Sequence, residues 1–160
     1  MTPPSGSDGT VSLLVLHHSP GTSVPTMVRA ACEGAARDGL EQVTVRRVAA
    51  LEVTAADVVA ADGYLLATPA NLGYMSGALK HAFDTVYNDA LDVTAGRPFG
   101  VLVHGESDTT GALLGIEKIT TGLRWRRAGE PVSVIGAVDD VALDACAELG
   151  AVVAATTLGY

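Results

Sequence analysis

Residues 63–84 read GYLLATPANLGYMSGALKHAFD and contain one complete strand, loop and helix. The apolar run at residues 63–67 is typical of a parallel strand that is covered on both faces, and Thr68-Pro69 ends it. A loop follows over residues 70–75. Ser76 can then cap a helix whose apolar residues recur with helical spacing. These apolar residues are Leu79, Ala82, Phe83, Val86 and Ala90.

The same unit recurs on both sides of this stretch. Further strands are expected at residues 11–16, 42–48, 99–103 and 132–138, and further helices over residues 24–39, 54–61, 112–123 and 142–153. Thr54 is the expected cap of the second helix, and Asp139 or Asp140 that of the last. Five strands that alternate with five helices predict a three-layer α/β fold with a five-stranded parallel sheet. The usual strand order at this size is 2-1-3-4-5.

In such a sheet a ligand binds outside the carboxyl ends of the strands, between strands 1 and 3. This rule selects the loops at residues 17–23, 69–76 and 104–111. A phosphoacceptor receiver domain would need an acidic pair after strand 1, where this chain has His17-His18. A dinucleotide-binding domain would need GxGxxG there, and only Gly21 is present. Both alternatives are therefore excluded.

The first loop, HHSPGTS at residues 17–23, leads directly into a helix. Free backbone amides and the positive end of the helix dipole can receive a phosphate there. The residues expected to contribute are His18, Ser19, Gly21, Thr22 and Ser23. The amides of the last three carry most of the expected contact, because the basic residues of the chain lie elsewhere.

The second loop carries a specific resemblance. The segment at residues 67–84 resembles the pattern TPxxxGxMSGxLKxFxD of flavodoxin-like, NAD(P)H-dependent FMN reductases and their quinone-reductase relatives. Matching positions are Thr68, Pro69, Gly73, Met75, Ser76, Gly77, Leu79, Lys80, Phe83 and Asp84. The resemblance implies a flavodoxin-like FMN-binding domain over residues 11–160. Residues 1–10, which are rich in Pro, Ser and Gly, are expected to form a disordered tail before it. We expect Gly73 to let the backbone approach the flavin ring closely.

The resemblance also implies which residues bind FMN after strands 3 and 4. They are Pro69, Ala70, Asn71, Leu72, Gly73, Tyr74, Met75, Gly105 and Glu106. Tyr74 is the expected aromatic neighbour of the ring, because the third loop, HGESDTTGA, has no aromatic residue. No catalytic side chain is expected, since the flavin supplies the redox chemistry.

The implied activity is hydride transfer from NAD(P)H, through bound FMN, to a quinone, a flavin or a similar small-molecule acceptor. Two alternatives stay open: an electron carrier of the flavodoxin type, and a flavodoxin-fold protein that no longer binds a cofactor. The missing aromatic stack favours the reductase over the carrier. The third alternative arises because His18 and Pro20 stand where phosphate loops usually have hydroxyl residues.

Composition limits the partners. A net charge of -8 argues against nucleic acid, and no metal-ligand spacing is present around Cys32 or Cys146. We expect a cytoplasmic protein without a membrane span, because no apolar run approaches the length of a bilayer span. The resemblance implies a homo-oligomer, expected as a homodimer with Tyr87 or Trp125 near its interface.

Overall fold

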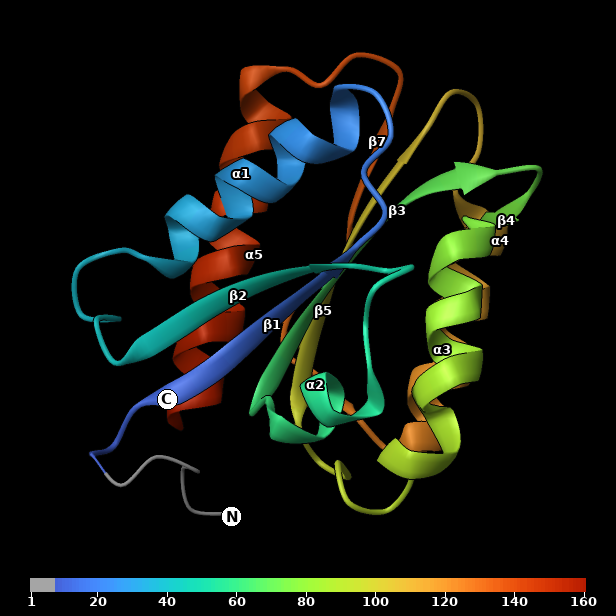
Figure 1. Ribbon diagram of the computed structural model, residues 1–160. Helices are drawn as coiled ribbons and strands as arrows, with labels where there is room; N and C mark the ends of the chain where they lie inside the picture. Colours follow the sequence, from blue (N-terminus) through green and yellow to red (C-terminus); the bar gives the residue numbers. More distant parts are fainter. Residues whose placement is uncertain (1–7) are drawn as a thin grey trace.

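The computed structural model describes residues 8–160, in which strands and helices alternate (Figure 1). Residues 1–7, which make up most of the expected tail, lie outside the described part. The strands are β1 (Val11–His17), β2 (Val43–Ala49), β3 (Gly63–Asn71), β4 (Tyr74–Met75), β5 (Pro98–Gly105), β6 (Arg126–Arg127) and β7 (Val132–Ile135). The helices are α1 (Ser23–Ala35), α2 (Ala55–Ala60), α3 (Gly77–Ala90), α4 (Thr110–Leu123) and α5 (Asp140–Leu158).

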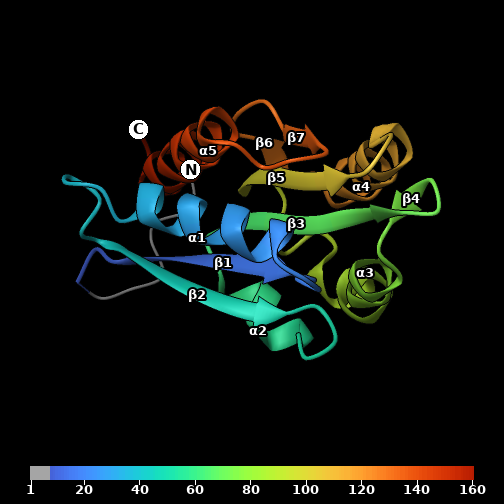
Figure 2. The ribbon, with the colours of Figure 1, turned by 90° about the horizontal axis from the view of Figure 1, so that it is seen from above.

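A parallel sheet forms the middle of three layers. Its strands lie in the order β2-β1-β3-β5, and β6 and β7 both pair with the remaining edge of β5. Helices α1 and α5 cover one face, and α2, α3 and α4 cover the other (Figure 2). The flavodoxin-like architecture and the order of the principal strands are confirmed.

Within residues 8–160 the sheet has seven strands rather than the five expected. One reason is that the outer edge strand is interrupted. Arg126 and Arg127 pair with the start of β5, and the chain returns to the end of β5 only at Val132. Pro131 stands in the gap and has no N–H to donate to a ladder. The strand expected over residues 132–138 then ends at Ile135, because Gly136 turns the chain with a φ of 80°.

The end of β3 corrects a second expectation. The strand does not stop before Thr68-Pro69 but continues to Asn71, and residues 70–75 form a β-hairpin with β4. Pro69 is tolerated because the β1 ladder has ended at Ala67, so only β5 borders β3 at this point. Leu72 and Gly73 have φ values of 50° and 77°, the positive pair that a type I′ hairpin turn requires.

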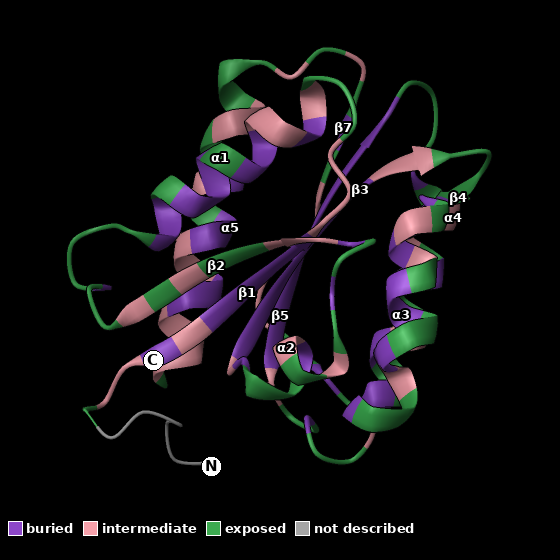
Figure 3. Ribbon diagram, in the orientation of Figure 1, coloured by how far each residue is buried: buried purple, intermediate pink, exposed green. Residues whose placement is uncertain are grey.

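The central strands are buried along most of their length (Figure 3). Side chains of β1 alternate between two cores, as a strand with both faces covered requires. Leu14 and Leu16 face the cluster under α2, α3 and α4, whereas Leu13 and Val15 face the cluster under α1 and α5. The same alternation decides which face of the sheet a residue at a strand end points toward.

Trp125 belongs to the core and not to the surface where an interface would need it. Its indole stacks on Tyr64 with ring centroids 3.9 Å apart, and its Nε1 donates to the Thr94 hydroxyl at 2.8 Å. Burial raises the pKa of Tyr64 to about 12. Trp125 therefore offers little surface to a second copy, whereas Tyr87 is half-buried on α3. That either residue lies near a subunit interface stays a prediction.

Helix α5 has 19 residues with a mean hydropathy of 1.6, so by length and composition it could cross a membrane. This corrects the expectation that no apolar run is long enough. In the fold, α5 instead packs against α1 on one face of the sheet (Figure 1). Backbones meet at the crossing: a Cβ on Gly34 would lie 1.8 Å from the Ala147 carbonyl oxygen, and one on Gly150 would lie 1.9 Å from that of Ala31.

This crossing yields a stability prediction. Helix propensity favours Ala over Gly by about 1 kcal/mol, yet we expect Gly150→Ala to lose roughly 1–3 kcal/mol because the added methyl forces α1 and α5 apart. Gly77→Ala is the matched control, since no atom lies within 4 Å of the added Cβ at the start of α3. Urea unfolding followed by circular dichroism measures both. Equal stability of the two variants would contradict the proposed crossing.

Candidate functional site

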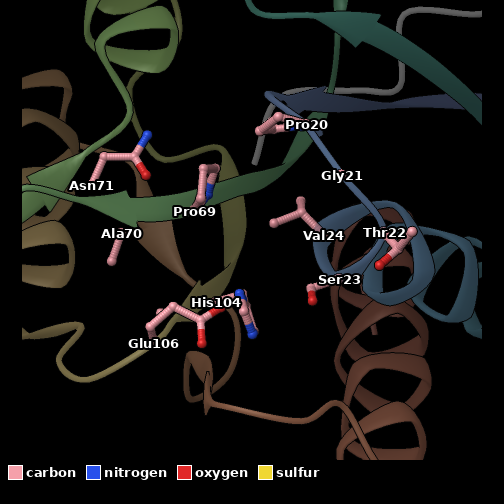
Figure 4. Close-up of a pocket in the computed structure, with 11 residues that line it drawn as sticks. Pro20, Gly21, Thr22, Ser23, Val24, Pro69, Ala70, Asn71, His104 and Glu106 are labelled. Atoms are coloured by element: carbon pink, nitrogen blue, oxygen red, sulfur yellow. The ribbon is translucent and has the colours of Figure 1, made fainter.

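A cleft of about 250 Å³ opens at the carboxyl ends of β3 and β5, beside the start of α1 (Figure 4). It lies where the parallel topology predicts a ligand. The lining residues are Pro20, Gly21, Thr22, Ser23, Val24, Pro69, Ala70, Asn71, His104, Gly105 and Glu106. All three loops selected from the sequence contribute to it.

The cleft brings together part of the sequence-predicted site. Gly21, Thr22, Ser23, Pro69, Ala70, Asn71, Gly105 and Glu106 line it, whereas His18, Ser19, Leu72, Gly73, Tyr74 and Met75 do not. Three lining residues were missed: Pro20, Val24 and His104. Val24 and His104 look like ordinary parts of a helix and a strand in the sequence. The available signal for His104 was its position at the carboxyl end of a buried parallel strand.

The start of α1 presents unused backbone donors to the cleft. Thr22 is the N-cap residue, but its side chain makes no capping hydrogen bond. By contrast, side chains of Thr54, Ser76 and Asp139 cap α2, α3 and α5, which confirms those three sequence predictions. The first amides of a helix lack partners within the helix and carry partial positive charge. An anion is therefore the ligand that this end of the cleft suits.

His18 and Ser19 hold the loop before α1 in place. The backbone N–H of His18 donates to the Ala67 carbonyl at 3.0 Å, which ties the loop to β3. The Ser19 hydroxyl forms a hydrogen bond with Nδ1 of His17 at 2.8 Å. Burial lowers the pKa of His17, and the nearby positive charge of Arg47 lowers it further. His17 is therefore neutral near pH 7 and supplies no charge for an anion.

Gly73, Tyr74 and Met75 of the β3–β4 hairpin pack against α4 and do not line the cleft, whereas Ala70 and Asn71 of the same hairpin do. A Cβ on Gly111 would lie 1.8 Å from the Gly73 carbonyl oxygen, and one on Gly115 would lie 2.5 Å from the Tyr74 ring. Met75 is buried beneath them. The close approach of the hairpin to α4 therefore requires glycine at position 111. At Gly73 a Cβ would meet no atom within 4 Å, so glycine is favoured there by the positive φ of the turn.

His104 and Glu106 are the titratable groups among the lining residues, and no Lys or Arg is present. His104 is 7% exposed, and its Nε2 lies 2.7 Å from the Gly136 carbonyl oxygen. Glu106 is exposed in the loop that follows. Within residues 8–160 no group of three His, Cys, Asp or Glu side chains is placed to hold a metal ion. Both cysteines are free and buried, and burial raises the pKa of Cys146 to about 11.

Comparison with known proteins agrees with the chemistry of this cleft. The family model described as NADPH-dependent FMN reductase matches residues 21–138. No curated protein matches the chain.

Solved structures with the same fold include two flavodoxin-like proteins that match this chain over almost their whole length. A flavodoxin, WrbA-like protein from Agrobacterium tumefaciens has 18% identity and a TM-score of 0.72, over 92% of this chain and 98% of that one. A flavodoxin from the domain Archaea has 17% identity and a TM-score of 0.75, over 91% of this chain and 98% of that one. The NADH:FMN oxidoreductase EmoB, in its apo form, has 16% identity and a TM-score of 0.74, over 92% and 90%. At these identities the likeness shows the fold alone.

Proposed function

The chain belongs to the NADPH-dependent FMN reductase family, and on that premise we propose that it uses NADPH or NADH to reduce a small-molecule acceptor, such as a quinone or a free flavin. FMN would be held in the cleft at the carboxyl ends of β3 and β5. The observation that carries the proposal is the uncapped start of α1, which faces this cleft beside small and apolar walls. Bound FMN would supply the chemistry by accepting a hydride and passing it on.

The phosphate end of the cofactor fits the start of α1. Gly21 has a φ of 71°, which turns the loop into the helix. The space beside its Cα is open, because no atom lies within 4 Å of the place that a Cβ would occupy. Amides of Thr22 and Ser23 follow, and Ser23 adds a hydroxyl in the cleft. No acidic side chain occurs in the first turn of α1. These groups would hold the phosphate without an arginine or lysine.

The opposite walls fit the flavin ring. Pro69 and Ala70 form one wall, and Gly105 forms another, so little side-chain bulk separates a flat ring from the strand ends. The Asn71 amide adds a polar group that can both donate and accept hydrogen bonds. No aromatic residue lines the cleft, since the Tyr74 ring lies against α4. One ring face would stay open to a nicotinamide, which favours a reductase over an electron carrier.

We further propose that the protein works as a cytoplasmic homodimer and binds neither nucleic acid nor membrane. The hairpin and α4 expose large apolar side chains close to the cleft: Leu72, Tyr74 and Leu114. A second copy placed there would cover this surface and narrow the opening of the cleft. The net charge of -8 argues against phosphate-rich polymers as partners.

The central prediction is that the protein binds FMN at micromolar concentration and that NADPH or NADH reduces the bound flavin. Titration should change the FMN fluorescence and spectrum. Without air, the nicotinamide should then bleach bound FMN much faster than the same concentration of free FMN, and a quinone should restore the colour. Binding without accelerated bleaching would support the carrier, and no binding would refute the proposal.

A second prediction locates the phosphate. Ser23→Ala removes one hydrogen bond to a charged group, worth about 1.5–3 kcal/mol, so FMN affinity should fall roughly tenfold or more. Riboflavin, which has no phosphate, should bind the variant as it binds the wild type. Equal weakening of both ligands would place the phosphate elsewhere.

A third prediction concerns assembly. Leu114→Glu places a charge on the exposed face of α4 and should convert the dimer to a monomer in light scattering with FMN present. Val141→Glu is the matched control, because Val141 is also apolar and exposed but lies on α5, on the other face of the sheet. A monomeric wild type would overturn the dimer.

A further inference from the structure

His104 points toward the same face of the sheet as the start of α1. Side chains of a strand alternate between faces, and Leu102 belongs to the core under α1 and α5. His104, two residues later on β5, therefore projects to that side. Figure 4 shows its ring lying between the end of β5 and the first turn of α1, where Ser23 is labelled.

One ring nitrogen of His104 is committed and the other is free. Nε2 lies 2.7 Å from the Gly136 carbonyl oxygen, and because a carbonyl only accepts, Nε2 carries the hydrogen. Nδ1 has no hydrogen-bond partner within residues 8–160. The described residues also leave no fully buried side-chain nitrogen or oxygen unsatisfied. An Nδ1 without a partner must therefore keep some accessible surface, although His104 as a whole is only 7% exposed. That surface faces the cleft, because the His104 side chain lines it.

Few negatively charged groups lie near Nδ1 of His104, so an anion can approach it. Neither the first turn of α1 nor the lining segment of β3 carries a titratable side chain. Asp139, beyond Gly136, accepts a hydrogen bond from the Ala142 amide as the cap of α5. His17, at the end of β1, is held neutral by burial and by Arg47. Glu106, on the loop of His104 itself, is the one carboxylate that lines the cleft, and it is exposed.

We infer that His104 is a titratable ligand of the FMN phosphate, which it meets together with the amides at the start of α1. The inference rests on the proposed function, because it assumes that FMN is the ligand. It adds a residue from β5, about 80 positions further along the chain, to a phosphate site otherwise built from one loop.

The protonation state of His104 decides the sign of its contribution. In the neutral ring, Nδ1 is an acceptor, so its lone pair faces the phosphate oxygens and repels them. In the imidazolium, Nδ1–H donates a charge-assisted hydrogen bond to the phosphate. FMN therefore binds the form with a protonated His104 better than the form with a neutral one.

The phosphate titrates as well, with a second pKa of about 6. At pH 8 the phosphate of free FMN is therefore mostly a dianion. When this dianion meets a neutral His104 ring, formation of the Nδ1–H···O contact takes up a proton from the buffer. Riboflavin, which lacks the phosphate, should take up none.

The experiment is calorimetric titration of the full chain with FMN and with riboflavin, at pH 6 and pH 8, in buffers that differ in their heat of ionisation. The variants are His104→Gln, whose amide can keep a donor near the Gly136 carbonyl, and His81→Gln as the matched control. His81 is exposed on α3, away from the cleft. The wild type alone already reports proton uptake, so the test holds even if His104→Gln fails to fold.

For the wild type and His81→Gln we expect FMN affinity to fall about tenfold or more from pH 6 to pH 8, with proton uptake at pH 8. His104→Gln should lose affinity at pH 6 and show little uptake, and riboflavin should bind all three proteins alike. If FMN and riboflavin bind without proton uptake at pH 8, or His104→Gln keeps the wild-type pH profile, the His104 inference is wrong although the proposed function stands. If neither ligand binds the wild type, the proposed function fails and the inference fails with it.

Discussion

The parallel register of β1, β3 and β5 is the constraint on which the rest of the molecule depends. It sets His17 opposite Ala67 and Pro69 opposite His104, so three strands that are distant in sequence end at one edge of the sheet. Each strand is followed by a segment that must cross to a covering helix. The loop into α1, the β3–β4 hairpin and the loop after β5 therefore meet there. The cleft exists because the backbone ladder places these segments together, and their side chains then decide what it holds.

The cleft can attract an anion only at short range. An acidic chain repels an anion at long range, and no Lys or Arg lines the site. Attraction must come from groups in direct contact, where screening matters least. The uncapped amides of α1 are one such source, and an imidazolium at His104 would be a second. A site of this kind binds by hydrogen-bond geometry, and the proposed histidine would make its affinity depend on pH.

Glycines on the helices shape the molecule as strongly as those in the loops. Gly34 and Gly150 let α1 and α5 touch along their backbones, which closes one layer over the sheet. Gly111 and Gly115 let the hairpin lie flat on α4, so that Tyr74 covers the helix and stays out of the cleft. A flavin ring held in the cleft as proposed would therefore have one face without an aromatic cover, which hydride transfer from a nicotinamide requires.

Local signals in the sequence determined the element order, the capped helices and the layered architecture. Thr54, Ser76 and Asp139 cap helices because their oxygens reach backbone amides only three residues ahead, which a short segment encodes by itself. The family pattern at residues 67–84 likewise identified the flavin-reductase family from contiguous residues. Only the tertiary structure decided the features that depend on residues distant in the sequence. Pro69 continues β3 because β1 has already ended, Trp125 is buried because Tyr64 lies beneath it, and His104 reaches the cleft because α1 begins on its side of the sheet. No local pattern contains these facts, since each is fixed by pairing and packing between segments that meet only when the chain folds.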